Sequence, residues 1–449
     1  MRGSKLVTLG LALTLLLAAC GNSDDDDDSA APTTGAGGST TPTTASDLTK
    51  NVPIDEVGVT DDEIHVNVIT AKTNPVGGKY AELADGINAY FAMINDGGGI
   101  YGRQLKITKE RDDQLANNQQ ETQAALAEDQ AFATFEATLL FTGADLLDEA
   151  DQPTFIWNIN PEMAGHDNIF ANASALCFGC DGHILPYMAE KHEATKIGIL
   201  AYGVSEESKR CAAGNRSSIE KYGAALGQEV AFFDDSIGFG QELSAQVAQM
   251  KSNGVQFITT CMDASETLVL AKEMKKQGLD AVQHLPNGYD HQLMTDNAAE
   301  FEGSIVIPQF LALETAEPLQ IQKDFEKWTK EIGVTPVETT IVGWILAHEF
   351  VEGLKAAGPE FNKAKLIAAL NAMTDYDAEG MIPPIDWTKG HIDPSTNPEV
   401  RGQLECANFT VVQGGNFVPE WVDDPAKPWT CFNETDPDIT KPIPTSFAE

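Results

Sequence analysis

The chain has 449 residues, of which 42% are hydrophobic, and its 68 acidic and 29 basic side chains give a net charge of −39 at pH 7. This length is enough for two lobes with large cores, and the charge argues against nucleic acid or an anionic membrane surface as a partner. No stretch after residue 20 is long and apolar enough to predict a transmembrane helix.

The N-terminus has the features of a bacterial secretory leader. Two basic residues precede an apolar run, 6–18, which is too short to span a bilayer as a mature helix. The run ends in Leu-Ala-Ala-Cys at 17–20, which resembles a lipobox, the site where a signal peptidase cuts before a cysteine that carries lipid. We therefore expect residues 1–20 to be a lipoprotein signal peptide and Cys20 to be lipidated. The alternative is an ordinary secretory signal in which Cys20 is incidental.

Residues 21–60 predict a disordered tether. Five consecutive aspartates, 24–28, are followed by a segment rich in Ala, Pro, Thr, Gly and Ser, which cannot bury enough apolar surface to fold. A flexible chain of this length has an end-to-end distance of roughly 35 Å. The acidic run lacks the glycine and the terminal glutamate of an EF-hand loop, so it does not predict a calcium site.

The globular part begins with a strand–helix–strand unit. Alternating apolar residues predict a strand over 64–69, apolar residues three and four apart predict a helix over 80–94, and a second strand is expected over 105–109. This order is typical of a parallel sheet with a right-handed crossover. Ligands of such sheets bind at the carboxyl ends of the strands, so the loop 70–78 is the first candidate for ligand contact.

The same alternation continues along the chain. Strands are expected over 131–135, 153–157, 197–200, 229–233, 256–260, 281–284 and 304–307. Helices are expected over 115–128, 143–149, 183–192, 206–222, 242–251, 263–277, 318–332, 339–357 and 363–372. Two successive sets of strands and helices predict two Rossmann-like α/β lobes with a cleft between them. The tail from Met373 is irregular and rich in proline, with a hairpin-like pair around Gly414-Gly415.

Several segments in this order carry a family resemblance. The run 94–105, Ile-Asn-Asp-Gly-Gly-Gly-Ile-Tyr-Gly-Arg-Gln-Leu, is similar to the helix-to-strand turn of the type I periplasmic binding proteins, in the branched-chain amino acid group of ABC-importer lipoproteins. Residues 153–156 resemble the fourth strand of that family, and residues 383–391 resemble its late segment before the last hairpin. The resemblance covers about residues 60–425. Because the glycines of the run follow a helix and precede a strand, we interpret them as turn geometry and not as a dinucleotide site.

The resemblance implies the type I periplasmic binding protein fold, with a ligand cleft at a three-strand hinge. The lobes are expected at 60–173 with 310–374, and at 174–309 with 375–435, leaving 436–449 as a tail. Closure of the lobes on a solute would be a population shift that a membrane permease reads.

Strand topology places the candidate ligand contacts in the loops that follow the strands. These candidates are Lys72, Val76, Gly77, Thr138, Trp157, Asn158, Asn160, Tyr202, Asp263, Tyr289 and Asp290. In amino-acid-binding members of the family, hydroxyl residues on one lobe hold the carboxylate, and a tyrosine and an acid on the other help to hold the ammonium group. Thr138 alone keeps a hydroxyl, Tyr202 is the candidate tyrosine, and Asp263 or Asp290 is the candidate acid.

These candidates also have structural interpretations. Asp263 begins a predicted helix with Glu266 three residues on, so it can serve as an N-cap alone. Trp157 can be a core residue. The aromatic side chains of Trp157, Tyr202 and Tyr289 favour a ligand with an apolar or aromatic body.

Six cysteines remain once Cys20 is set apart, an even number in an exported protein, which predicts three disulfides among 15 possible pairings. Adjacent parallel strands lead into the loops of Cys211 and Cys261, so this pair is favoured. Cys406 with Cys431 would tie the tail, and Cys177 with Cys180 would close a small loop.

We therefore expect a lipid-anchored solute-binding protein of an ABC importer on the extracytoplasmic side of a bacterial cell membrane. It would act as a monomer without catalysis, cofactor or metal, would touch the membrane through its lipid alone, and would bind an amino acid or another small amphipathic or aromatic metabolite. Two alternatives remain: an exported thiol-redox enzyme that uses the Cys177–Cys180 pair, and a solute-sensing receptor module.

Overall fold

The computed structural model describes residues 48–74, 77–177, 179–397, 400–433 and 436–448. The predicted leader, the lipidation site Cys20 and most of the predicted tether lie outside the described residues. Within them, no helix is long and apolar enough to cross a membrane.

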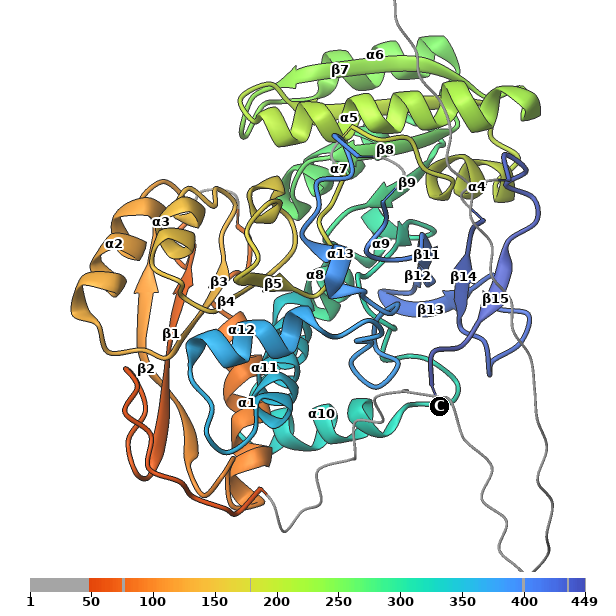
Figure 1. Ribbon diagram of the computed structural model, residues 1–449. Coiled ribbons are helices and arrows are strands. Elements are labelled where there is room, and N and C mark those ends of the chain that lie inside the picture. The colour runs from red at the N-terminus through yellow and green to blue at the C-terminus, as the bar shows by residue number, and fades with distance from the viewer. Residues whose placement is uncertain (1–47, 75–76, 178, 398–399, 434–435, 449) are drawn as a thin grey trace, which may run out of the picture. The chain divides into compact units, whose positions relative to one another are not determined.

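The first sheet contains five parallel strands in the order β2-β1-β3-β4-β5 (Figure 1). Its strands are β1 Glu63–Thr70, β2 Gln104–Asp112, β3 Ala133–Ala137, β4 Thr154–Ile156 and β5 Ile169–Ala171. The helices that pack on this sheet or on its covering layer are α1 Leu83–Asp96, α2 Asn118–Glu128, α3 Ala144–Glu149, α10 Gln320–Glu331, α11 Glu338–Ala357 and α12 Lys363–Asn371.

The second sheet contains seven strands in the order β13-β12-β10-β9-β8-β6-β7. The five strands from β10 to β7 are parallel, while β12 and β13 add an antiparallel hairpin at one edge. The strands are β6 Lys196–Tyr202, β7 Glu229–Ile237, β8 Phe257–Cys261, β9 Val282–Leu285, β10 Ile305–Val306, β12 Phe409–Gln413 and β13 Asn416–Glu420. Its helices are α4 Ile184–Lys191, α5 Glu206–Ser218, α6 Ser244–Asn253, α7 Ala264–Gln277, α8 His291–Asp296 and α9 Ala298–Phe301.

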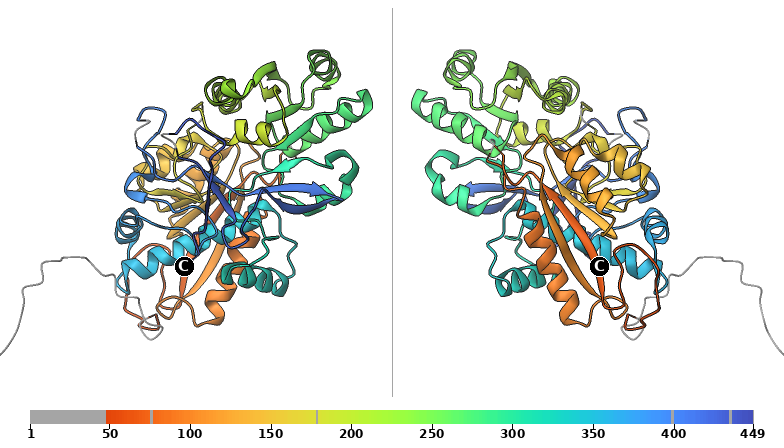
Figure 2. Two further views of the ribbon diagram at one scale, coloured as in Figure 1. Left: turned by 90° about the vertical axis from the view of Figure 1, so that its right-hand side faces the viewer. Right: turned by 90° about the vertical axis from the view of Figure 1, so that its left-hand side faces the viewer.

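The chain passes between the two sheets after β5, after β10 and after α12. Both sheets and their helices can be followed from two further sides in Figure 2. The third passage carries the short helix α13 Trp387–Gly390 and leads to a small antiparallel sheet of β11 Cys406–Ala407, β14 Trp429–Cys431 and β15 Ile443–Thr445. The predicted two-lobe α/β architecture is thus confirmed.

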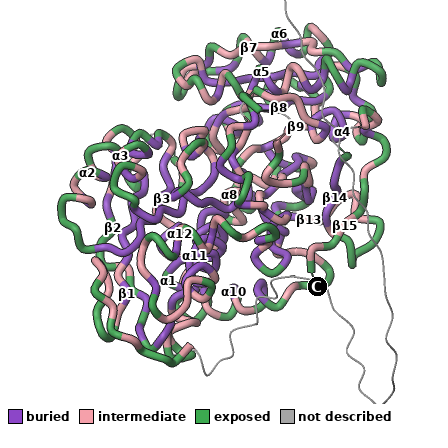
Figure 3. The backbone as a smooth tube through the Cα atoms, viewed as in Figure 1, coloured by how far each residue is buried: buried purple, intermediate pink, exposed green. Residues whose placement is uncertain are grey.

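Helix α11 is the centre of the larger core. Sixteen of its 20 residues are buried, which Figure 3 shows as a purple stretch beside the first sheet. It packs on α1, α12 and β4. A helix that is apolar on nearly all sides must lie inside a domain, and α11 satisfies this rule.

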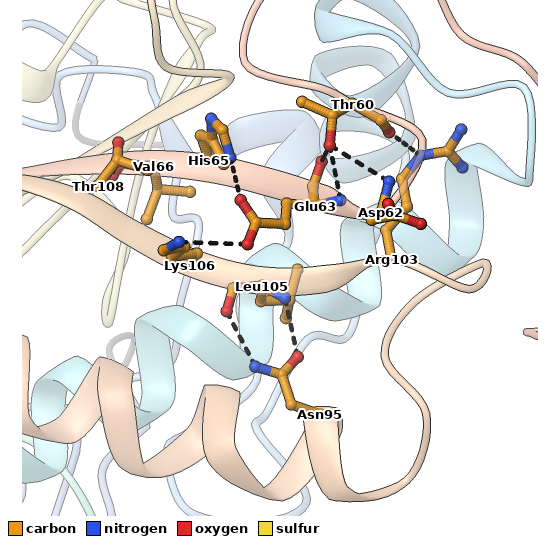
Figure 4. Close-up of polar contacts among 10 residues, drawn as sticks. All are labelled: Thr60, Asp62, Glu63, His65, Val66, Asn95, Arg103, Leu105, Lys106 and Thr108. Atoms are coloured by element: carbon orange, nitrogen blue, oxygen red, sulfur yellow. Dashed lines mark hydrogen bonds and ion pairs between the residues drawn. The ribbon is translucent and has the colours of Figure 1, made fainter.

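The glycine-rich turn between α1 and β2 is structural (Figure 4). Asn95 Nδ2 donates to the Leu105 carbonyl at 2.9 Å, and Asn95 Oδ1 accepts the Leu105 N–H at 2.8 Å. Arg103 is fully buried, and its Nε donates to the Thr60 carbonyl at 2.7 Å. Gly99 has φ +79°, and a Cβ there would lie 2.0 Å from the Arg103 carbonyl oxygen. These contacts agree with the interpretation of the glycines as turn geometry.

The three predicted disulfides are confirmed. Cys211 joins α5 to Cys261 at the end of β8, the strand beside β6. The other two pairs are Cys177–Cys180, in the first passage between the sheets, and Cys406–Cys431, which joins β11 to β14.

Candidate functional site

A cavity of about 310 Å³ lies where the carboxyl ends of strands from the two sheets face each other. The first lobe contributes the loop after β1, the residue after β4 and the start of α11, and the second lobe contributes the start of α7 and the loop and helix after β9. The lining residues include Gly77, Lys79, Tyr80, Trp157, Asp263, Ser265, Leu268, Tyr289, Asp290, Asp296, Glu338 and Thr339. This is the edge of a parallel sheet at which ligands bind.

On the first lobe, the wall is aromatic. The rings of Tyr80 and Trp157 lie 5.8 Å apart, measured between centroids. Trp157 follows β4 and is 5% exposed, and its indole Nε1 donates to Gln309 Oε1 at 2.9 Å. Gln309 Nε2 in turn donates to the Asn158 carbonyl at 2.9 Å. Since Gln309 follows β10 of the other sheet, it fixes Trp157 relative to the second lobe.

On the second lobe, Asp263 combines two roles. Its Oδ1 accepts the N–H groups of Ser265 at 2.8 Å and Glu266 at 3.2 Å, so it caps α7. Its Oδ2 accepts the hydroxyl of Tyr202, whose ring packs on Phe239 with centroids 4.5 Å apart. Burial, with the neighbouring Asp263 charge, raises the pKa of the Tyr202 phenol. Tyr202 does not line the cavity itself; it stands behind Asp263.

Further polar contacts join the lobes at the cavity. Lys79 Nζ, before α1, lies 2.9 Å from Asp290 Oδ2, at the start of α8. Glu338 Oε2, at the start of α11, accepts the N–H of Tyr289 at 3.3 Å. Burial is the main cause that raises the pKa of the Glu338 carboxyl to about 7; the Tyr289 N–H opposes this rise and the Asp290 charge adds to it.

Tyr289 is held from the other side. Its hydroxyl donates to Glu314 Oε2 at 2.5 Å and accepts the Leu313 N–H at 2.9 Å, and its ring stacks on Phe417. Burial raises the pKa of this phenol, and the Glu314 charge contributes to the rise. The predicted residues Gly77, Trp157, Asp263, Tyr289 and Asp290 are thus brought together around one cavity.

Other predicted contacts lie elsewhere. The hydroxyl of Thr138 bonds to Leu140 and to Asp113. Asn158 Nδ2 donates to the carbonyls of residues 173 and 174, and Asn160 Nδ2 donates to the Thr138 carbonyl, so both amides support loops and do not face the cavity. Lys72 is exposed beside Asp112 and does not line the cavity, and Val76 lies outside the described residues.

Several cavity residues had no signal as site residues in the sequence, among them Tyr80, Lys79 and Glu338. Tyr80 fits the apolar pattern of the helix predicted over 80–94, but α1 begins at Leu83, and Tyr80 lies in the cavity wall. Lys79 precedes it. Glu338 comes from the start of α11, which follows no strand, so the rule that selected the other loops does not reach it.

Residues 63–397 match the family model described as periplasmic binding protein. The chain belongs to this family. Its members are extracytoplasmic solute-binding proteins of the ABC-transporter type and are not enzymes. They bind small-molecule solutes and work with ABC permeases. The predicted family is therefore confirmed, and membership lends no support to the thiol-redox alternative.

Solved structures of the same fold come from several bacteria. A branched-chain amino acid ABC transporter from Thermus thermophilus with bound valine shares 16% identity at a TM-score of 0.65, covering 80% of this chain and 96% of that chain. A substrate-binding protein from Streptococcus pneumoniae in complex with isoleucine shares 15% at 0.65, covering 80% and 99%.

A fatty acid ABC transporter substrate-binding protein from Thermomonospora curvata shares 16% identity at a TM-score of 0.63, covering 81% of this chain and 93% of that chain. None of the curated proteins compared with the chain matches it. Identities this low establish the fold alone, and the solutes named for these neighbours, valine, isoleucine and fatty acid, differ from one another.

Proposed function

We propose that the protein is a lipid-anchored receptor that captures a small amphipathic solute, an amino acid or a related metabolite, between its lobes and delivers it to an ABC permease. The observation that carries this proposal is the composition of the cavity, in which aromatic residues of one lobe face acidic residues of the other. An ordered aromatic wall opposite charged groups suits a ligand with an apolar body and a polar end.

The anchor and the division into lobes belong to the same proposal. Lipid on Cys20 and a flexible tether, 21–60, would hold a monomeric receptor near the membrane, and the lobes would comprise 60–173 with 310–374 and 174–309 with 375–435. Replacement of Cys20 by Ser should release the protein from the membrane fraction into the soluble fraction. Membrane retention of this variant would contradict the anchor.

A thermal-shift screen of the full-length protein tests ligand capture. The panel covers branched and aromatic amino acids, aromatic acids, amides and amines. A ligand present at 100 times its Kd should add about 2.7 kcal/mol to the free energy of unfolding. Trp157→Ala should weaken binding of any hit at least tenfold, because it removes one half of the aromatic pair. Lys276→Ala, which removes a surface ion pair with Glu273 at the far end of α7, should leave the affinity unchanged. If no compound raised the melting temperature, the proposal would lose its support.

A further inference from the structure

The wall of the cavity has an excess of negative charge. Among the described residues that line it, Asp263, Asp290, Asp296 and Glu338 are acidic, and Lys79 alone is basic. Lys79 is already paired with Asp290 across the lobes. A ligand that entered with a carboxylate would therefore add like charge to the wall, which costs binding energy at short range.

Several donors in the cavity wall that could hold a carboxylate are already used within the protein. The N–H groups of Ser265 and Glu266, at the start of α7, are bound to Asp263 Oδ1. The Tyr289 hydroxyl donates to Glu314, and the Trp157 indole donates to Gln309. Each of these groups would have to break a bond before it could bind an anion.

One acceptor, by contrast, is free. Glu338 lines the cavity and is 6% exposed, and its Oε2 makes the single bond to Tyr289. In the described part of the chain no hydrogen bond or ion pair reaches its other oxygen, Oε1. A carboxylate oxygen that lines a cavity without a partner is open to a hydrogen-bond donor or a cation.

We propose that the cavity binds an organic ammonium ion with a small apolar body and no carboxylate, and that Glu338 Oε1 is its direct partner. The inference deepens the proposed function and rests on it. The ammonium group would lie between Glu338 on one lobe and Asp263 on the other, while its apolar body would pack on Tyr80 and Trp157. Aromatic rings add to the attraction, because a cation is favoured near their faces. A cavity of about 310 Å³ is at the small end for ligand sites and suits a ligand of this size.

Isothermal titration calorimetry of the full-length protein at pH 8 tests the assignment with three compounds that share one branched apolar body. Isoamylamine carries the ammonium group alone, leucine carries ammonium and carboxylate, and isovalerate carries carboxylate alone. We expect isoamylamine to bind at least tenfold more tightly than leucine, and isovalerate to give no heat of binding. If leucine bound as tightly as isoamylamine or better, the inference would be overturned while the proposed function stood. If none of the three bound, the inference would be overturned as well, and the thermal-shift panel would decide the proposed function separately.

A matched pair of variants tests the contact itself. Glu338→Gln keeps an acceptor for the Tyr289 N–H but removes the charge, and it should weaken isoamylamine binding at least tenfold. Glu349→Gln makes the same change at another buried glutamate, about three turns along α11 and away from the cavity, and it should leave the affinity unchanged. Equal affinity of the wild-type protein and Glu338→Gln would overturn the inference.

Proton release provides a readout that a purely structural role would not give. The charged neighbours of Glu338 in the cavity wall are Asp290, Asp263, Asp296 and Lys79. Burial raises the pKa of the Glu338 carboxyl to about 7. An ammonium ligand that binds at pH 7 should therefore expel a proton, which appears as a dependence of the binding heat on the ionisation heat of the buffer. Glu338→Gln should abolish this dependence. Proton release that persisted unchanged in the variant would assign it to another group and overturn the role of Glu338.

Discussion

Helices α1 and α11 approach so closely that a single methyl group at their contact should destabilise the fold. Gly86 of α1 faces the backbone of α11, where an added Cβ would lie 1.8 Å from the Thr340 carbonyl oxygen and 2.8 Å from the Trp344 nitrogen. The contact is reciprocal, because a Cβ on Gly343 would lie 2.1 Å from the Leu83 carbonyl oxygen. Gly86→Ala therefore places carbon against backbone that no side-chain rotation can move.

The size of the effect follows from these distances. Non-bonded heavy atoms have their optimal separation at about 3.5 Å, so the two helices must separate locally by roughly 1.7 Å to admit the Gly86→Ala methyl group. The interior around α11 is close-packed and cannot absorb this shift without cost. Overpacking of this kind costs about 1–3 kcal/mol, while alanine gains about 1 kcal/mol in helix propensity over glycine. Since the clash involves backbone on both sides, we expect a net loss of about 2 kcal/mol.

Guanidinium unfolding followed by circular dichroism measures this loss. Gly97→Ala is the matched control: it lies at the end of the same helix, has φ −75°, and places its Cβ no closer than 3.3 Å to another atom. The control should stay within about 0.5 kcal/mol of wild type, as surface substitutions do. If Gly86→Ala were as stable as Gly97→Ala, the close contact of α1 with α11 would be wrong. Because Tyr80 and Glu338 lie within a few residues of this contact, Gly86→Ala should also weaken ligand binding.

Two further predictions concern stability away from the cavity. Replacement of both Cys211 and Cys261 by serine opens a loop of 50 residues. This change should lower the free energy of unfolding by about 4 kcal/mol under oxidising conditions. A loss below about 1 kcal/mol would contradict this prediction. Glu349→Gln should become more stable relative to wild type as the pH rises. Burial raises the pKa of Glu349 well above its usual value, so the folded state holds a proton that the unfolded state releases, and wild-type stability falls with increasing pH by up to about 1.4 kcal/mol per unit. Denaturant midpoints of both proteins at pH 5, 6 and 7 measure the difference, and parallel curves would show that Glu349 is not protonated.

Most strands and helices could be predicted from the periodicity of their apolar residues, because each of these elements is long enough for the spacing to repeat. The second sheet's parallel strands and its helices α4 to α7 follow this rule closely, and Asp263 caps α7 as expected. The short helices α8 and α9 were not predicted. Strand β5 was missed because three residues, Ile169–Ala171, show no period. The start of α1 was predicted too early. Tyr80 fits the spacing of apolar residues on a core-facing helix, but its side chain lies in the cavity wall.

The site could be predicted as far as topology determines it. Trp157, Asp263 and Tyr289 line the cavity because each lies beyond the carboxyl end of a parallel strand. The same rule selected Thr138, Asn158 and Asn160, whose side chains instead satisfy nearby backbone groups. A polar side chain in these loops faces the cavity only if no nearby backbone N–H or C=O group needs it as a hydrogen-bond partner. Tertiary contacts decide which backbone groups need such a partner, and a local sequence pattern does not contain this information.

Glu338 shows why the electrostatics of the cleft are tied to the arrangement of the lobes. It belongs to the first lobe, and its bond partner Tyr289 follows a strand of the second, so this contact exists only where the lobes meet. On the proposed function, closing the lobes would bring Glu338 toward Asp263 and Asp290, and like charges would oppose closure unless a cation separated them. Lys79 supplies one such cation through its pair with Asp290. On the proposed assignment an ammonium ligand supplies the second, and because it contacts acids of both lobes, it gains most of its binding energy in the closed form. Differential affinity of this kind is what a ligand needs to shift the population toward closure.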